Sequence, residues 1–122
     1  MATTPQAGTQ MFDAMKAAFE TSDAKALAAM YDDQAVIEVI NQNAPPKNPR
    51  RIAGKDEIAR YLVDVCGRNL QHHFEEQLVT GDHAAYLERC IYPDGVNVLS
   101  ESIMTMRDGR ILRQTTIEAW DQ

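Results

Sequence analysis

The second half of the 122-residue chain is the part of the sequence that most restricts the fold. Runs of β-prone residues are separated there by compact turns at Gly81-Asp82, Pro93-Asp94-Gly95 and Asp108-Gly109. Asp-Gly between two such runs is a strong hairpin signal, because a type I′ turn needs positive φ at both central residues. The pattern predicts four successive antiparallel strands, over residues 71–80, 84–92, 96–107 and 110–120.

Apolar residues recur at helical spacing in three segments of the first half, which are residues 9–20, 24–33 and 55–66. Thr21 and Ser22 are suited to capping the second helix, and Gly67 is suited to ending the third. The β-branched run over residues 35–40 predicts a strand.

The order of these elements predicts an α+β domain, in which three helices precede a long antiparallel sheet. Residues 41–49 contain three prolines and predict a loop, and Ile52 belongs to a short extended segment. We expect residues 1–8 to form a flexible tail and residues 9–122 to form a single domain.

The formal net charge of −6 argues against a nucleic-acid binder, which needs a basic patch to neutralise phosphates. The cationic cluster of Lys47, Arg50 and Arg51 is expected to be a solvated loop edge. The acidic balance also disfavours binding to an anionic membrane surface. We therefore expect no nucleic-acid or membrane partner.

The sequence shows neither a signal peptide pattern nor an apolar run of membrane-spanning length. Cys66 and Cys90 lie in otherwise apolar segments, which favours packed free thiols, although a disulfide between them stays open at this point. We expect a cytoplasmic protein.

A series of short motifs runs from Ser22-Asp23-Ala24 and Met30-Tyr31-Asp32-Asp33, through Gly54-Lys55-Asp56-Glu57-Ile58, to the ending Met106–Ile111 and Glu118–Asp121. Their order and spacing resemble the nuclear transport factor 2-like superfamily, and within it the ketosteroid isomerase and SnoaL-like polyketide cyclase group. The resemblance implies a cone-shaped α+β barrel, in which a strongly curved antiparallel sheet wraps around the helices and leaves a deep pocket. It also implies a homodimer formed through the convex face of the sheet.

The residues that carry known reactions in this group are replaced here. The resemblance places the isomerase tyrosine and its two aspartates at Met15, Val39 and Met104, which are all apolar. Without a base and oxyanion donors, ketosteroid isomerisation is not expected. The histidine–aspartate pair of the polyketide cyclases falls at Ser102 and Thr116, so that pair is missing as well.

Glu88 is the first candidate catalytic residue. Side chains alternate along a strand, and the resemblance places Tyr86, Glu88, Cys90 and Tyr92 on the inner face. A carboxylate inside an apolar cone suits general acid–base work. The alternative is a structural glutamate that pairs with a neighbouring donor, or a register that points it outward.

His72 and His73 are the next candidates, and at most one of them can enter the pocket because adjacent strand residues face opposite ways. In dehydratase and dehydrochlorinase relatives of this fold, a histidine near this point works with an aspartate, for which Asp23 is the candidate here. The alternative for Asp23 is a carboxylate that starts a helix.

Metal and cofactor sites are not expected. No two ligand-type residues show metal-ligand spacing on one face, and phosphate-binding and Cys-x-x-Cys motifs are absent from the sequence.

Strand alternation and the resemblance together give the expected ligand contacts, which are Met15, Tyr31, Val39, Tyr61, Tyr86, Ser100, Ser102, Met104, Glu118 and Trp120. Three hypotheses follow. The chain is an enzyme that performs cofactor-free acid–base chemistry (of isomerase, cyclase, dehydratase or hydrolase type) on a hydrophobic polyketide-, steroid- or terpenoid-like compound. Alternatively, it is a non-catalytic ligand-binding cone or a protein-interaction module.

Overall fold

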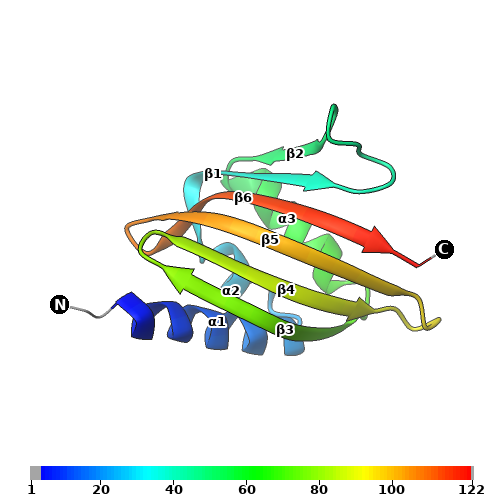
Figure 1. Cartoon of the computed structure of the whole chain (residues 1–122), viewed down its shortest axis with the longest axis horizontal. Coiled ribbons are helices and arrows are strands. Elements are labelled where there is room, and N and C mark those ends of the chain that lie inside the picture. The colour runs from blue at the N-terminus through cyan, green and yellow to red at the C-terminus, as the bar shows by residue number, and fades with distance from the viewer. Residues whose placement is uncertain (1–3, 122) are drawn as a thin grey trace.

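Three helices lie on one face of a six-stranded sheet in this computed structural model, which describes residues 4–121 (Figure 1). The helices are α1 (Thr4–Glu20), α2 (Ala24–Ala28) and α3 (Lys55–Cys66). The strands are β1 (Tyr31–Ile40), β2 (Arg50–Ala53), β3 (Gln71–Thr80), β4 (His83–Ile91), β5 (Asn97–Arg107) and β6 (Arg110–Trp120). The predicted α+β class and the order of its elements are confirmed. Among the described residues, no helix combines the length and the apolar character needed to cross a membrane.

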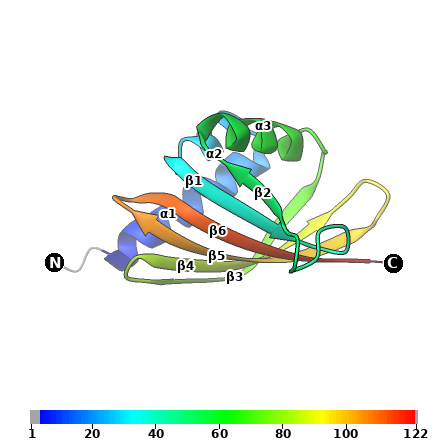
Figure 2. The ribbon, with the colours of Figure 1, turned by 90° about the horizontal axis from the view of Figure 1, so that it is seen from above.

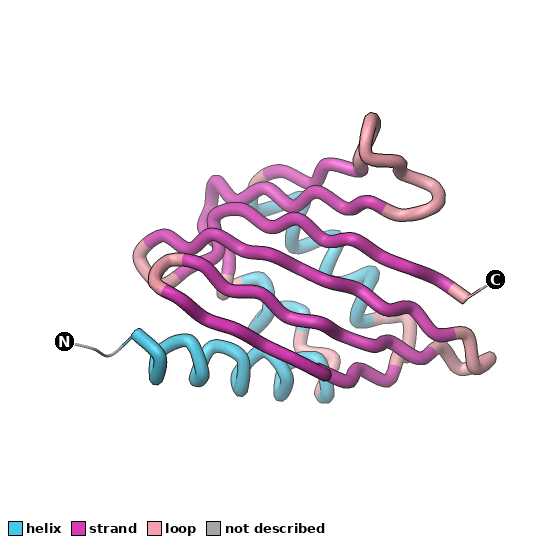
Figure 3. The backbone as a smooth tube through the Cα atoms, viewed as in Figure 1, coloured by secondary structure: helices cyan, strands magenta, loops and turns pink. Residues whose placement is uncertain are grey.

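The sheet has the strand order β2-β1-β6-β5-β4-β3 and is mixed, because β1 and β6 run parallel while every other neighbouring pair is antiparallel. The antiparallel prediction is therefore correct for the second half of the chain and wrong at the junction with the first. The sheet curves around the helices without closing into a barrel, as Figures 2 and 3 show. Register shifts at Phe74/Glu76 and Thr105/Met106 contribute to this curvature, because a bulge bends its strand.

The turns of the second half set the register of the sheet. Asp108 and Gly109 both have positive φ, of 52° and 79°, as the predicted type I′ turn requires. In the β3–β4 turn only Gly81 has positive φ, of 55°, which is the pattern of a hairpin turn with glycine at its first central position.

Two helix boundaries differ from the sequence-based expectation. Helix α1 begins at Thr4, inside the expected tail, while residues 1–3 lie outside the described part of the chain. Helix α2 ends at Ala28, and the residues expected to complete it begin β1. The parallel partner strand explains this difference, since the Ile111 amide donates to the Met30 carbonyl at 2.9 Å and Tyr31 pairs with Ile111. Pairing with a distant strand outweighs the local helical spacing.

The hydrophobic core fills the space between the helices and the sheet. Helix α1 packs along β3, and α3 packs along β1 and β2. Phe12, Met15 and Met104 are completely or almost completely buried in this core. Met15 and Met104, which were expected to contact a ligand, are part of this core. The polar part of the interior lies elsewhere.

Candidate functional site

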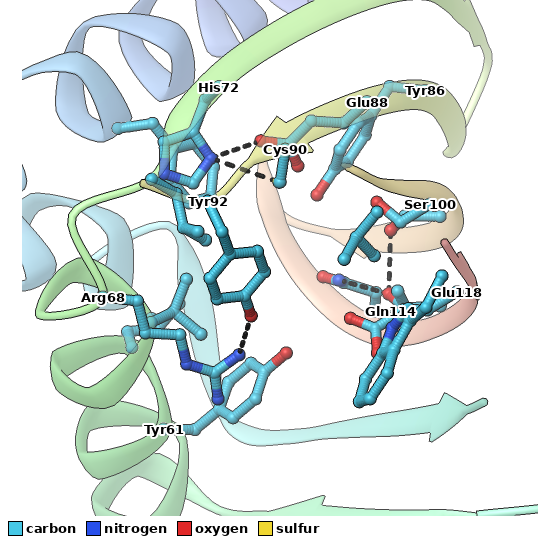
Figure 4. Close-up of a pocket in the computed structure, with 18 of the residues that line it drawn as sticks. Tyr61, Arg68, His72, Tyr86, Glu88, Cys90, Tyr92, Ser100, Gln114 and Glu118 are labelled. Atoms are coloured by element: carbon cyan, nitrogen blue, oxygen red, sulfur yellow. Dashed lines mark hydrogen bonds and ion pairs between the residues drawn. The ribbon is translucent and has the colours of Figure 1, made fainter. Parts of the chain in front are cut away.

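A cavity of about 70 Å³ lies between α3 and the inner face of strands β4–β6, close to the C-terminal end of β6 (Figure 4). Most of the predicted site residues line it, namely Tyr31, Tyr61, His72, Tyr86, Glu88, Ser100, Ser102, Glu118 and Trp120. The cavity thus has a wall of polar and aromatic side chains, in contrast with the apolar core beside it.

Strand register places the polar residues of this wall in rows that cross the sheet. Glu88 is opposite Ser100, and Ser100 is opposite Glu118, so one row joins β4, β5 and β6. His72 on β3 is opposite Cys90 on β4. Because side chains alternate along each strand, the inward direction predicted for Glu88 and Cys90 is confirmed.

His72 and Glu88 form a buried hydrogen-bonded pair. Nδ1 of His72 lies 2.7 Å from Oε2 of Glu88, and the two side chains are only 6% and 7% exposed. An ionised carboxylate only accepts hydrogen bonds, so Nδ1 donates when Glu88 is charged. The ring of Phe19 lies against the imidazole, with the ring centroids 4.6 Å apart. A charge-assisted hydrogen bond of this kind is stronger where water is excluded.

Cys90 adjoins this pair. Its Sγ lies 3.5 Å from Nδ1 of His72. Burial, followed by the negative charge of Glu88, raises the pKa of the Cys90 thiol well above its usual range. Within the described residues Cys90 and Cys66 are both free thiols, which answers the question of a disulfide that the sequence left open.

His72, Glu88 and Cys90 together bring three metal-ligand atoms within 4.8 Å of one another. The expectation that no ligand-type residues share a face with metal-ligand spacing is therefore wrong. Glu88 and Cys90 lie on one face of β4, and His72 meets them from β3.

A chain of hydrogen bonds crosses the far side of the cavity. The Tyr31 hydroxyl donates to Oε1 of Gln114 at 2.6 Å, and Nε2 of Gln114 donates to Oγ1 of Thr116 at 2.9 Å. The Thr116 and Ser102 hydroxyls are 2.8 Å apart. Burial raises the pKa of Tyr31 and of Tyr86, so both phenols are neutral donors near pH 7.

An outer chamber of about 440 Å³ adjoins the cavity and shares Tyr61, Arg68, Glu118 and Trp120 with it. Nδ2 of Asn41 donates to Oε1 of Glu118 at 2.9 Å, which ties the loop of residues 41–49 to the sheet. Among the described residues, Nε1 of Trp120 is buried without a hydrogen-bond partner. A buried donor left unpaired is costly, so it marks a place where a bound molecule gains a hydrogen bond.

Arg68 forms the other side of the rim. It pairs with Asp64 and donates to the Tyr92 hydroxyl at 3.3 Å. Figure 4 shows this group on the α3 side of the cavity, near Tyr61. Burial raises the pKa of Tyr61 to about 12.

Some predicted site residues lie elsewhere. His73 is exposed, and it is His72 that enters the cavity. Asp23 caps α2, where its Oδ1 accepts a hydrogen bond from the Ala26 amide at 3.0 Å, as the helix-start alternative predicts. Val39 lines the outer chamber rather than the inner cavity.

Gln114 and Arg68 are lining residues that sequence reasoning missed. Gln114 shares a face with Thr116 and Glu118 by strand alternation, so extending that pattern by one step identifies it. Arg68 follows the end of α3 and carried no comparable signal.

Comparisons with known proteins agree with this geometry. The family model described as a SnoaL-like domain matches residues 11–114. A nuclear transport factor 2-like protein of unknown function from Mesorhizobium loti superposes with a TM-score of 0.83 at 22% identity, covering 98% of this chain and 95% of its own. A similar protein from Burkholderia xenovorans LB400 gives 0.83 at 19% identity, with coverages of 97% and 87%.

A third solved structure, from Kribbella flavida DSM 17836, is provisionally named a ketosteroid isomerase. It superposes with a TM-score of 0.77 at 18% identity, covering 98% of this chain and 81% of its own. No curated protein matches the sequence. At these identities the neighbours show the fold alone, whereas the family model covers most of the sequence. The chain belongs to the SnoaL-like domain family, with the nuclear transport factor 2-like cone fold.

Proposed function

We propose that the chain is an enzyme in which Glu88, held by His72, is the acid–base group for a reaction on a small hydrophobic molecule. The observation that carries this proposal is the buried 2.7 Å contact between the two side chains on the cavity wall. Carboxylates and imidazoles are common general acids and bases in enzymes.

The hydrogen bond between His72 and Glu88 gives the two residues different roles. Oε2 of Glu88 is engaged by Nδ1 of His72, so Oε1 is the atom that takes a proton from the substrate. The imidazole holds the carboxylate in place and donates to it. Tyr86 and Ser100 lie beside Glu88 on the same wall, and their hydroxyls are the donors for a developing negative charge on a substrate oxygen.

The cavity dimensions restrict how a substrate enters. About 70 Å³ admits only the reacting end of a molecule, whereas the adjoining 440 Å³ chamber has room for its body. Ligand pockets for drug-sized molecules are typically about 300–1,000 Å³. The aromatic rings of Tyr61 and Trp120 lie where the two spaces meet, which suits a flat hydrophobic polyketide-, steroid- or terpenoid-like compound.

The reaction type within this proposal is a proton transfer of the isomerase, cyclase, dehydratase or hydrolase kind. Standard ketosteroid isomerase chemistry is not part of it, since Met15, Val39 and Met104 are apolar and buried. The same apolar positions favour the second candidate, a binding protein that holds such a compound without converting it.

A homodimer is a further part of the proposal. Leu78, Ile103 and Ile117 are 73%, 53% and 50% exposed on strands β3, β5 and β6. They alternate with inward-facing residues and therefore lie on the outer face of the sheet. Sedimentation velocity tests this part, since a species of 13.7 kDa at micromolar concentration would contradict it.

The test of the catalytic proposal needs no knowledge of the natural product. The protein is incubated in deuterated buffer with a panel of polyketide-, steroid- and terpenoid-like ketones, and deuterium next to the carbonyl is measured by mass spectrometry. We expect exchange to be accelerated by the wild-type protein and lost in Glu88→Gln. Glu101→Gln is the matched control, because Glu101 is an exposed residue on the neighbouring strand β5.

The outcomes separate the hypotheses. Exchange by Glu88→Gln at the wild-type rate would contradict the role of Glu88. Tight binding of a panel member to the wild-type protein, without exchange or product, would favour the binding protein instead. A thermal melt of each variant shows whether a loss of exchange comes from a loss of folding.

A further inference from the structure

We propose that His72, Glu88 and Cys90 form a zinc-binding site on the cavity wall, with three protein ligands and a fourth position open to the cavity. These residues offer an imidazole nitrogen, a carboxylate oxygen and a sulfur within 4.8 Å of one another. Zinc takes these three donor types, whereas Mg²⁺ and Ca²⁺ prefer oxygen alone. The chemistry of the donor set therefore points to zinc.

The backbone holds the donors in place. His72 and Cys90 are directly opposite each other in the antiparallel β3–β4 pair, and Glu88 precedes Cys90 on the same face of β4. A site on paired strands has less freedom than one on a loop, so little ordering is needed when an ion binds.

The two distances from His72 can be compared with those around a tetrahedral ion. Nδ1 of His72 and Sγ of Cys90 are 3.5 Å apart. Zinc bonds of about 2.05 Å to nitrogen and about 2.3 Å to sulfur, at a tetrahedral angle, place these two atoms about 3.5 Å apart. Nδ1 and Oε2 of Glu88 are closer, at 2.7 Å, because they share a hydrogen bond. Replacing that hydrogen bond by two metal bonds requires these atoms to separate to about 3.3 Å.

The charges balance when zinc is bound. The Glu88 carboxylate and a Cys90 thiolate carry two negative charges, which the dication neutralises. In forming the zinc–sulfur bond Cys90 loses its thiol proton to solvent. The proton that Nδ1 of His72 donates to Glu88 moves to Nε2, or is lost to solvent from a doubly protonated ring, so the neutral ring binds zinc through the freed Nδ1 lone pair. No oxidant or reductant takes part.

Zinc occupancy goes beyond the proposed acid–base function and excludes it while the ion is bound. The ion takes the lone pair of Nδ1 and an oxygen of Glu88, which are the atoms of the hydrogen bond that supports proton transfer. The metal-bound form and the proton-transferring form are therefore mutually exclusive states of the same side chains. With three protein ligands, the fourth position is left for water or a ligand in the cavity, as in catalytic rather than structural zinc sites.

The test measures metal binding without any substrate. The full chain is treated with a chelator, dialysed and titrated with Zn²⁺ against a competing chromophoric chelator. The same protein is titrated with Co²⁺, whose thiolate charge-transfer absorption reports a metal–sulfur bond. We expect one equivalent per chain with the charge-transfer band. Cys90→Ser is expected to lose the band and to bind zinc at least ~10–100-fold more weakly, the loss that even outer partners of a metal ligand cause.

The chain supplies matched controls. Cys66→Ser removes the other cysteine, and His73→Ala removes the exposed histidine next to His72, so both are expected to keep the band and the affinity. His72→Ala is expected to lose zinc like Cys90→Ser. Circular dichroism of each metal-free variant identifies any that fails to fold. If Cys90→Ser or His72→Ala fails to fold, the Cys66→Ser variant is sufficient to test the site. Cys90 is its only remaining cysteine, so a cobalt–thiolate band in that variant must come from Cys90.

The proposal is overturned if the wild-type chain binds no zinc, or if Cys90→Ser binds it as tightly as the wild type. These results are distinguishable from a failure of the proposed enzyme function. The zinc and cobalt titrations use no substrate, and the exchange assay can be run on metal-free wild-type protein, so each proposal can fail while the other holds.

Discussion

Tyr31, the first residue of β1, donates a 2.6 Å hydrogen bond to Gln114 on β6, 83 residues away in the sequence. This bond spans the one parallel strand pair of the described sheet, and it starts the polar chain that continues to Thr116 and Ser102. The same contact therefore links the first half of the chain to the second and fixes one side of the cavity.

Gln114→Leu tests the contribution of this chain to stability. The substitution removes a buried partner from both Tyr31 and Thr116, so we expect the free energy of unfolding to fall by about 1–3 kcal/mol. Tyr31→Phe removes only one hydroxyl and should cost about 0.5–1.5 kcal/mol. Urea unfolding of the two single variants and the double variant measures the coupling, and strictly additive losses would contradict the proposed chain.

The buried pair of His72 and Glu88 makes a second stability prediction. Removing one partner of a buried hydrogen bond leaves the other group unsatisfied, whereas replacing both by apolar residues can be nearly neutral. We expect Glu88→Leu to destabilise the fold by about 1–3 kcal/mol, and the double variant His72→Leu/Glu88→Leu to recover much of this loss.

The exposed pair of Glu75 and Arg89, with Nε and Oε2 2.9 Å apart, is the control for the buried one. Glu75→Ala should change the free energy of unfolding little, because water screens an exposed pair. A double variant at positions 72 and 88 that is less stable than Glu88→Leu would contradict the coupling of these two side chains through their buried hydrogen bond.

Alkaline pH is expected to destabilise the fold through its buried tyrosines. Burial raises the pKa of Tyr61 to about 12, from an ordinary value of about 10. A group whose pKa is higher in the folded state contributes stability that is complete below the unfolded pKa and is lost as pH rises toward the folded pKa. We therefore expect the free energy of unfolding to fall between about pH 10 and pH 12, by up to about 2 kcal/mol from Tyr61.

Tyr61→Phe is the variant that checks this. It should make the decline in the free energy of unfolding above pH 10 shallower. Part of the decline should remain, because burial also raises the pKa values of Tyr31 and Tyr86. The difference between the variant and the wild type at pH 7 provides the baseline. An identical slope for the two proteins above pH 10 would contradict a buried Tyr61 hydroxyl.

Much of the fold follows from local signals, because turns and alternation act over a few residues. Asp108 and Gly109 specify their hairpin through positive φ, and Gly67 ends α3 as predicted. The parallel pairing of β1 with β6 carries no local signal. It decides that Tyr31 begins a strand instead of ending a helix.

Some features of the candidate site also follow from local sequence signals, and others do not. Alternation correctly placed Glu88, Ser100 and Glu118 on one wall, because the period of a strand is fixed by its pleat. The meeting of His72 with Cys90 depends on the register between two strands, so spacing along the sequence could not reveal it. Met15 and Met104 lie in the core and not on the cavity wall. The resemblance locates positions in a fold, whereas the shape of a cavity depends on the size of every neighbouring side chain.

Trp120 gives the last prediction, since its Nε1 is buried without a partner among the described residues. It is the only tryptophan of the chain and lines both the cavity and the outer chamber, so its fluorescence should report ligand binding directly.

Trp120→Phe removes the unpaired N–H while keeping an aromatic ring. The metal-free, ligand-free protein should therefore lose little stability beyond the packing of the smaller ring. Affinity for a panel compound that bears a hydrogen-bond acceptor should fall by about 3–10-fold, the effect of one net hydrogen bond. Calorimetry measures this loss, because the variant lacks the fluorescent reporter. A matched compound without the acceptor should bind both proteins alike, and an equal loss for the two compounds would show that the ring, not its N–H, makes the contact.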